Sequence, residues 1–258
     1  MAPGWGWGWG WGSGCGSAAL VLGSVLLFRA LQRALGRLPL PAHVRGDRTR
    51  TWRWRNLLVS FAHSVLSGPW AVLAVLQAPE MLTDIERPWS ASGHVLVCFS
   101  AAYFIHDSLD IVLSRQARAS WEYLVHHAMA ISAFLSGTFQ RRFLGAGLLS
   151  LFVEVSNIFL TIRMLLKLSN VPAPVLYRVN KYVNLVMYFL FRLAPQAYLS
   201  WCFLRRVEQR GLGAFLTVNL CLLNVMILTY FSRLLRSDFF PHWRKRPGAG
   251  GEKKFLAE

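Results

Sequence analysis

The chain has 258 residues, of which 54% are apolar, and its formal net charge is +16. Apolar runs of about 20 residues recur too often for a soluble core, so the composition excludes a single soluble globular domain and predicts a multi-pass membrane protein. The basic residues mostly flank these runs, and this placement favours anionic lipid over nucleic acid as the partner.

The N-terminal part of the chain divides into two segments. Residues 1–17 include a Gly-Trp repeat at 4–12, offer little packing surface and are predicted to form a disordered tail. Residues 18–37 contain a weaker span at 18–35, whose apolar stretch from Ala18 to Phe28 is only eleven residues long and so fits a signal peptide as well as an anchor. Cleavage would send the Arg-rich loop that follows to the outside, so we expect a retained anchor helix.

Six stronger spans follow within 40–236, and residues 237–258 form a basic tail. The spans are predicted at 57–77, 93–113, 121–139, 144–166, 176–204 and 212–235. With all seven segments crossing the membrane, the loops on one side carry 21 of the 28 Lys and Arg residues. By the positive-inside rule this side is cytoplasmic, which places the N-terminus outside and the C-terminus in the cytoplasm. The predicted fold is an all-α membrane protein.

Ionisable and amide side chains gather in the cytoplasmic half of the predicted spans. They are His63, His106, Asp107, Asp110, His126, His127, Glu154, Asn157, Arg163, Asn184 and Arg192. Such groups are costly at membrane depth, and helical spacing places several of them on shared faces. We therefore expect the spans to surround a polar, ligand-binding cavity that opens inward. The alternative is that these groups form interhelical hydrogen bonds that hold the bundle together.

The adjacent histidines His126 and His127 are the first candidates for chemistry. An imidazole held by a carboxylate can act as a base or nucleophile at neutral pH, so this pair and Glu154 are the candidate catalytic residues. Arg192 could neutralise a carboxylate or receive a lipid phosphate. Iron or zinc ligation is the competing reading, but membrane desaturases and hydroxylases carry a third His three residues before the pair, where this chain has Tyr123. We predict no metal and no cofactor.

Three segments resemble one known family. His126-His127-Ala-Met-Ala-Ile-Ser132 is followed by Glu154-Val-Ser-Asn-Ile-Phe-Leu-Thr-Ile-Arg163 and preceded by Tyr103-Phe-Ile-His-Asp107. In this order they resemble the TLC domain family, which includes the ceramide synthases, over roughly residues 40–236. The resemblance implies a six-helix TLC-type transmembrane barrel with an inward-facing cavity, plus one N-terminal helix.

The resemblance also bears on activity. In ceramide synthases a His-Asp-x-x-Asp motif follows the matching His pair, and these groups transfer an acyl chain from acyl-CoA to a sphingoid amine. Here Val153, Glu154 and Asn157 stand at those positions, so one His and one carboxylate are missing. Relatives with the Glu-x-Ser-Asn pattern look like regulators of phospholipid acyl composition and membrane fluidity.

Three functions follow as alternatives. The leading prediction is a protein that binds a lipid or acyl-CoA in the inward-open cavity and regulates phospholipid acyl composition, with catalysis left open. The second is an acyl-CoA-dependent acyltransferase, with His126 or His127 as base or acyl carrier and Glu154 as the orienting group. The third is an accessory subunit of a channel or other membrane protein. Membrane phospholipids and fatty acyl-CoA are the expected partners, in the plasma membrane or, alternatively, the endoplasmic reticulum.

Overall fold

The computed structural model describes residues 14–170 and 174–240, and in these residues it contains helices, turns and loops but no strand. The elements are α1 (Gly14–Leu35), α2 (Arg48–Gln77), α3 (Glu80–Thr83), α4 (Ala91–Leu113), α5 (Trp121–Gln140), α6 (Leu144–Ser150), α7 (Val153–Ser169), α8 (Pro174–Tyr188), the π-helical turn η1 (Phe189–Leu193), α9 (Ala194–Arg206) and α10 (Gly211–Phe239). The fold is therefore that of an all-α protein, as the sequence predicts.

Five helical segments in the described residues are long and apolar enough to cross a membrane, namely α1, α2, α4, Leu144–Ser169 and α10. Their number and composition indicate a multi-pass membrane protein. Two further predicted spans, 121–139 and 176–204, also form helices, α5 and the run from α8 to α9. These two are less apolar because they carry several polar residues that line the interior of the bundle, among them His126, His127, Arg192 and Gln196.

Local sequence explains where several helices begin or change. Asp47 precedes α2, and its side chain accepts hydrogen bonds from the backbone N–H groups of Thr49 and Arg50, at 2.8 and 3.1 Å. This is the usual N-cap arrangement. Pro195 lacks an N–H group and crowds the turn before it, and the widened turn η1 lies at that place.

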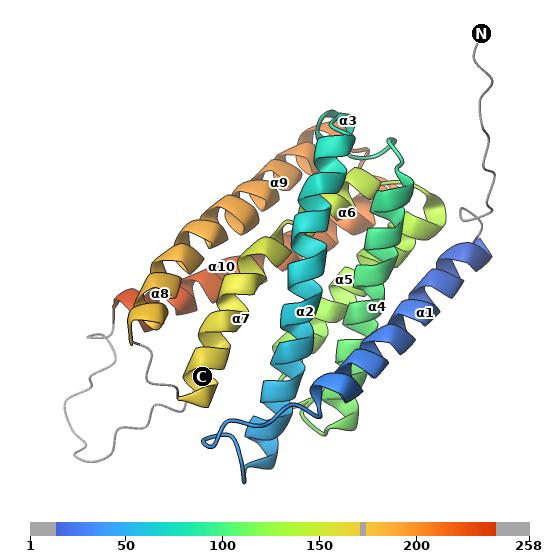
Figure 1. Ribbon diagram of the computed structural model, residues 1–258. Coiled ribbons are helices and arrows are strands. Elements are labelled where there is room, and N and C mark those ends of the chain that lie inside the picture. Colours follow the sequence, from blue (N-terminus) through green and yellow to red (C-terminus); the bar gives the residue numbers. More distant parts are fainter. Residues whose placement is uncertain (1–13, 171–173, 241–258) are drawn as a thin grey trace.

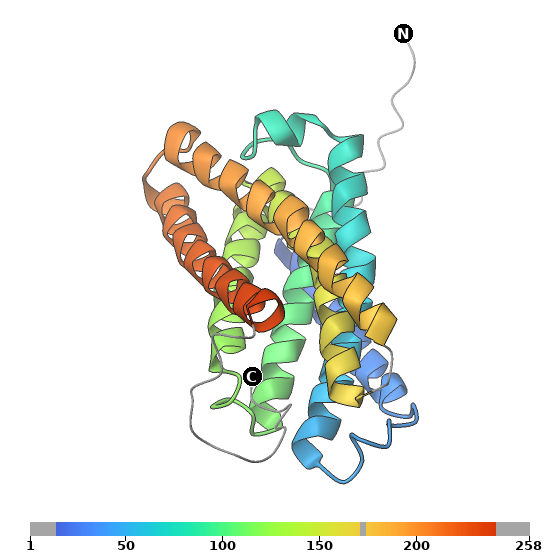
Figure 2. The same ribbon diagram turned by 90° about the vertical axis from the view of Figure 1, so that its left-hand side faces the viewer.

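Six helical units form a closed ring. Contacts run from α2 to α4, α5 and α10, then to α9 and, through η1 and α8, to α7, which returns to α2. Helix α1 lies outside this ring against α4 and α2 (Figure 1). Seen from the side in Figure 2, α9 and α10 lie on the face away from α1. The arrangement matches the predicted six-helix barrel with one additional N-terminal helix.

The two ends of the bundle differ in composition. We call one the basic end, which holds the Arg-containing loops 36–47 and 114–120, and the other the α3 end, which holds α3 and the loop 207–210 (Figure 1). At the α3 end, α6 contacts α2, α4, α5 and α9. An apolar cluster there includes stacked Phe143 and Phe203, whose ring centroids are 5.6 Å apart. The α3 end of the ring is therefore packed with buried apolar side chains.

The predicted terminal segments differ in extent from the structure. Residues 14–17, predicted as part of the tail, belong to α1, whose Ser17 is buried against His94. Residues 237–239, predicted as the start of the basic tail, are the last turn of α10. The remaining tail residues, 1–13 and 241–258, lie outside the described residues.

Candidate functional site

A cavity of about 1830 Å³ occupies the interior of the ring. Its wall toward the α3 end is mostly apolar and includes Val97, Phe134, Phe143, Leu199 and Leu220. Its wall toward the basic end is polar and cationic and includes Arg53, Arg118, Lys167, Tyr177 and Ser237. The cavity therefore changes from apolar to polar along the axis of the bundle.

The predicted histidine pair lines this cavity from α5. Nδ1 of His127 lies 3.5 Å from Oδ2 of Asp107 on α4, and both side chains are buried. Asp107 also accepts a hydrogen bond from the side-chain amide of Asn56. The acyltransferase hypothesis has Glu154 as the orienting group of the pair, whereas in the structure Asp107 is the carboxylate that contacts His127.

Glu154 is buried in the first turn of α7 and contacts α2 instead. Ser64 Oγ donates to Glu154 Oε2 at 2.6 Å, and Asn157 Nδ2 donates to the same oxygen at 3.0 Å. Nδ1 of His63 lies 3.5 Å from this oxygen. The His63 ring is fully buried and stacks on Tyr103 with centroids 4.0 Å apart. Glu154 and His63 thus form a second histidine–carboxylate pair, of which only Glu154 lines the cavity.

Arg192 extends from η1 into the same wall. Its Nε donates to Ser156 Oγ at 3.1 Å, and its Nη2 donates to the side-chain oxygen of Asn157. Because the amide nitrogen of Asn157 donates to Glu154, this residue connects a buried guanidinium with a buried carboxylate. Glu154, Asn157 and Arg192 all line the cavity, as expected from the sequence.

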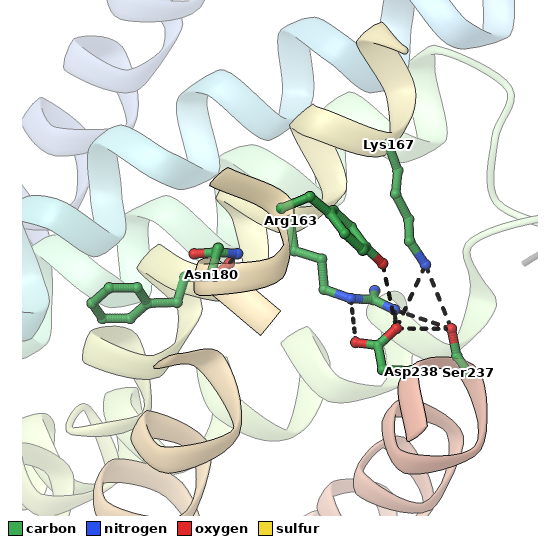
Figure 3. Close-up of polar contacts among 7 residues, drawn as sticks. Arg163, Lys167, Asn180, Ser237 and Asp238 are labelled. Atoms are coloured by element: carbon green, nitrogen blue, oxygen red, sulfur yellow. Dashed lines mark hydrogen bonds and ion pairs between the residues drawn. The ribbon is translucent and has the colours of Figure 1, made fainter. Parts of the chain in front are cut away.

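Arg163 belongs to a polar cluster at the basic end, which we call the α7–α10 clasp: Arg163, Lys167, Tyr177, Ser237 and Asp238 (Figure 3). Arg163 Nε donates to Asp238 Oδ2 at 2.8 Å, and Nη2 donates to Asp238 Oδ1 and Ser237 Oγ. The ion pair is nearly buried, with 10% and 2% of the two side chains exposed. The clasp joins the last turn of α10 to α7 beside the cavity.

Two other predicted residues face away from the cavity. His106 and Asp110 lie on the side of α4 that contacts α1, where Gln32 Nε2 donates to Asp110 Oδ1 at 2.6 Å. His106 Nε2 lies 3.2 Å from the side-chain oxygen of the same Gln32. Helical spacing correctly places His106 and Asp110 on one face, but the position of α1 decides that this face lies outside the ring.

Asn184 is also absent from the cavity wall. It is fully buried on α8, and neither of its side-chain polar atoms has a hydrogen-bond partner among the described residues. The polar residues expected in one cavity therefore occupy three places. Some line the cavity, His106 and Asp110 face α1, and His63 and Asn184 are buried behind the cavity wall.

The histidines are distributed between separate pairs. His63 contacts Glu154 and His127 contacts Asp107, each at 3.5 Å. In the part of the chain that the structure describes, no three His, Cys, Asp or Glu side chains are grouped so that they could hold a metal ion. Each of these two histidines is thus in contact with one carboxylate.

Comparison with known proteins identifies the family. The TLC domain profile matches residues 53–236, a stretch that contains nearly all of the ring, from the second turn of α2 to the last turn of α10. The chain belongs to the TLC domain family. The TLC match begins after α1, so α1 is an addition to the TLC domain proper.

Relatives within the TLC family cover nearly the full chain. The chain is 66% identical to TLC domain-containing protein 1 of Gallus gallus, over 95% of this chain and 94% of that protein. It is also 66% identical to TLC domain-containing protein 1 of Homo sapiens, over 93% and 96% of the two chains. TLC domain-containing protein 2 of Danio rerio is 35% identical over 86% and 90%. The resemblance predicted from the His126 and Glu154 segments is thereby confirmed.

The TLC domain of this chain has the parts needed for proton exchange. An imidazole with a carboxylate at one ring nitrogen can use its other nitrogen to take a proton from a ligand and return it. His127 has this arrangement and lines the cavity. His126 also lines the cavity. Asp107 is the partner of His127, and sequence spacing did not assign it. Helical periodicity shows which residues share a face, but it does not show which neighbouring helix that face contacts.

Proposed function

We propose that this protein binds a lipid or acyl-CoA in its cavity and thereby regulates phospholipid fatty-acyl composition and membrane fluidity. The supporting observation is the cavity itself, whose volume of about 1830 Å³ exceeds the roughly 300–1,000 Å³ of pockets for drug-sized ligands. A long amphiphile suits its gradient, with the acyl chain beside residues such as Phe134 and the head beside Arg118 and Lys167.

The proposal includes an orientation and a location. The basic end faces the cytoplasm, because Lys and Arg are concentrated there. The N-terminus is then outside, and the polar part of the cavity lies on the side where acyl-CoA is dissolved. Membrane phospholipids and fatty acyl-CoA are the proposed partners, in the plasma membrane, with the endoplasmic reticulum as the alternative.

A bulky residue in the cavity wall tests the proposal. Ala130 is buried on α5, lines the cavity and lies one turn after His126. Ala130→Trp should lower the amount of lipid that co-purifies with the protein about tenfold, because overfilling a packed site costs about 1–3 kcal/mol. Mass spectrometry of the extracted lipid measures this loss.

Ala128→Trp is the matched control, since Ala128 is exposed on the same helix and is absent from the cavity wall. It should retain the wild-type amount of lipid. In cells challenged with a fatty acid, Ala130→Trp should change the phospholipid acyl profile as deletion of the protein does. A folded Ala130→Trp variant with undiminished lipid, or a deletion that leaves acyl profiles unchanged, contradicts the proposal.

The second candidate function is an acyl-CoA-dependent acyltransferase, and the contact of 3.5 Å between His127 and Asp107 favours it. In this reaction His127 takes the proton of an acceptor hydroxyl or amine, and the acceptor attacks the thioester carbonyl. The carbon–sulfur bond breaks, and the proton passes to the departing thiolate. Asp107 holds the imidazole in position and stabilises its cation.

Purified protein with labelled palmitoyl-CoA tests this candidate. His127→Ala should lower turnover about 10²–10⁴-fold, the usual contribution of a general base. His43→Ala, in an exposed loop residue, should leave turnover unchanged. Thermal unfolding of both variants shows whether the bundle is intact. Turnover that survives the loss of both His126 and His127 rules this candidate out.

A further inference from the structure

A second, smaller cavity of about 320 Å³ lies outside the ring, between α1 and α4 at the basic end. Its wall includes Arg29, Gln32, Arg33, His106, Asp110 and Leu113. Helices α1 and α4 run side by side in Figure 1, and α1 lies outside the matched TLC domain. This cavity is therefore separate from the proposed acyl site and depends on the additional helix.

The charges in its wall favour an anion. Arg29 and Arg33 are four residues apart on α1, share one face and are exposed. Asp110 is the only acidic residue in the wall, and it accepts hydrogen bonds from Gln32 and Trp52, at 2.6 and 2.8 Å. The wall thus has a net charge of +1. Basic pockets between membrane helices are typical sites for anionic lipid headgroups.

The hydrogen bonds in the wall of this cavity also require a hydrogen-bond donor on the ligand. The side-chain amide nitrogen of Gln32 donates to Asp110. The side-chain oxygen of Gln32 therefore accepts from His106 Nε2 at 3.2 Å, so Nε2 carries the imidazole proton. Nδ1 of His106 is then an acceptor, and it has no partner among the described residues although only 4% of His106 is exposed. A ligand that donates an O–H group would satisfy it.

Apolar side chains continue from the charged groups along the outer surface. Leu22 and Leu26 precede Arg29 on the same face of α1 and are 65% and 68% exposed. Leu113 of α4, which belongs to the wall, is 67% exposed. In a membrane-spanning helix these side chains are available to acyl chains.

We propose that the groove between α1 and α4 binds an anionic glycerophospholipid whose headgroup carries a hydroxyl. The phosphate lies between Arg29 and Arg33, the hydroxyl donates to His106 Nδ1, and the acyl chains lie along Leu22 and Leu26. A single negative charge balances the wall. A choline headgroup has neither an O–H nor an N–H donor and leaves the acceptor unpaired.

Native mass spectrometry of the full chain in detergent, with lipids of identical acyl chains, tests the headgroup. Phosphatidylglycerol should bind about tenfold more tightly than phosphatidylmethanol, which has the same charge but no hydroxyl. Phosphatidylcholine should bind more weakly still. Equal binding of all three overturns the proposal, and equal binding of the two anionic lipids overturns the role of His106. Glycerol 3-phosphate should not compete; if it competes as well as the lipid, the ligand is a free phosphate compound.

Paired substitutions test the site. Arg29→Gln/Arg33→Gln should weaken phosphatidylglycerol binding about thirtyfold, which corresponds to about 1 kcal/mol for each cation. Arg37→Gln/Arg48→Gln removes the same charge from exposed residues of the same end outside the wall, and should retain binding. Equal effects of the two double variants overturn the proposal. Ala130→Trp should leave this binding unchanged, which separates it from the cavity function.

Discussion

Asp238→Asn is expected to lower the free energy of unfolding by about 3–5 kcal/mol, because it leaves a buried cation without its counterion. Arg163 donates to both carboxylate oxygens of Asp238, and the pair is almost inaccessible to solvent. Asparagine has the same shape but neither charge nor a second acceptor oxygen. Denaturation of the purified protein in mixed micelles measures the change.

Two further variants make this result specific. Glu208→Gln breaks an ion pair whose side chains are 88% and 75% exposed, and exposed pairs contribute little, so stability should be unchanged. Arg163→Leu/Asp238→Leu replaces the pair with apolar groups and should recover most of the lost stability. If Asp238→Asn unfolds at the same denaturant concentration as the wild type, the clasp does not stabilise the ring.

Gly68→Ala is expected to cost about 1–3 kcal/mol, since the added methyl group has no room at the contact of α2 with α7. A Cβ atom at Gly68 would lie 2.9 Å from the backbone nitrogen of Val155 and 3.1 Å from the carbonyl carbon of Glu154. Backbone atoms cannot rotate away, so α7 must move. The hydrogen bond from Ser64 to Glu154 lies in the preceding turn of α2 and should weaken as well.

Gly23→Ala is the control for this effect and should change stability in the opposite direction. Gly23 lies inside α1, and a Cβ atom there would meet nothing within 4 Å. Alanine at an open helical position typically stabilises by about 0.4–1 kcal/mol. Thermal unfolding of the two variants side by side provides the measurement. Equal stabilisation by both would mean that α2 and α7 do not approach as closely as described.

Apolar run length was sufficient to predict the α-helical class and the number of helical units, because it acts along one segment at a time. The closure of six of these units into a ring, with α1 outside it, followed from the resemblance to the TLC domain family and not from run length. The break at Leu151 and Phe152, between α6 and α7, lies inside the single span predicted at 144–166. Its position depends on α6 packing across the α3 end of the ring, and residue type within the apolar run gives little sign of it.

The sequence allowed us to predict which polar residues share a helix face, but not which residues they contact on other helices. Spacing within one helix places His106 with Asp110, and Glu154 with Asn157, because these residues share a face. It does not say which helix that face meets, so the contact of His127 with Asp107 could not be assigned. Asp238 was missed as a partner of Arg163 because it follows the apolar run and resembles the beginning of a solvated tail.

Asn157 lies between the Glu154 carboxylate and the Arg192 guanidinium on one wall of the cavity and separates these two opposite charges. Its amide donates to Glu154 and accepts from Arg192. A separated carboxylate and guanidinium produce an electric field, and in surroundings of low dielectric constant this field is weakly screened. A polar carbonyl group beside Asn157 has its lowest energy with oxygen toward Arg192 and carbon toward Glu154. Under the proposed function, this field would favour one orientation of the carbonyl group of an ester or thioester in the cavity.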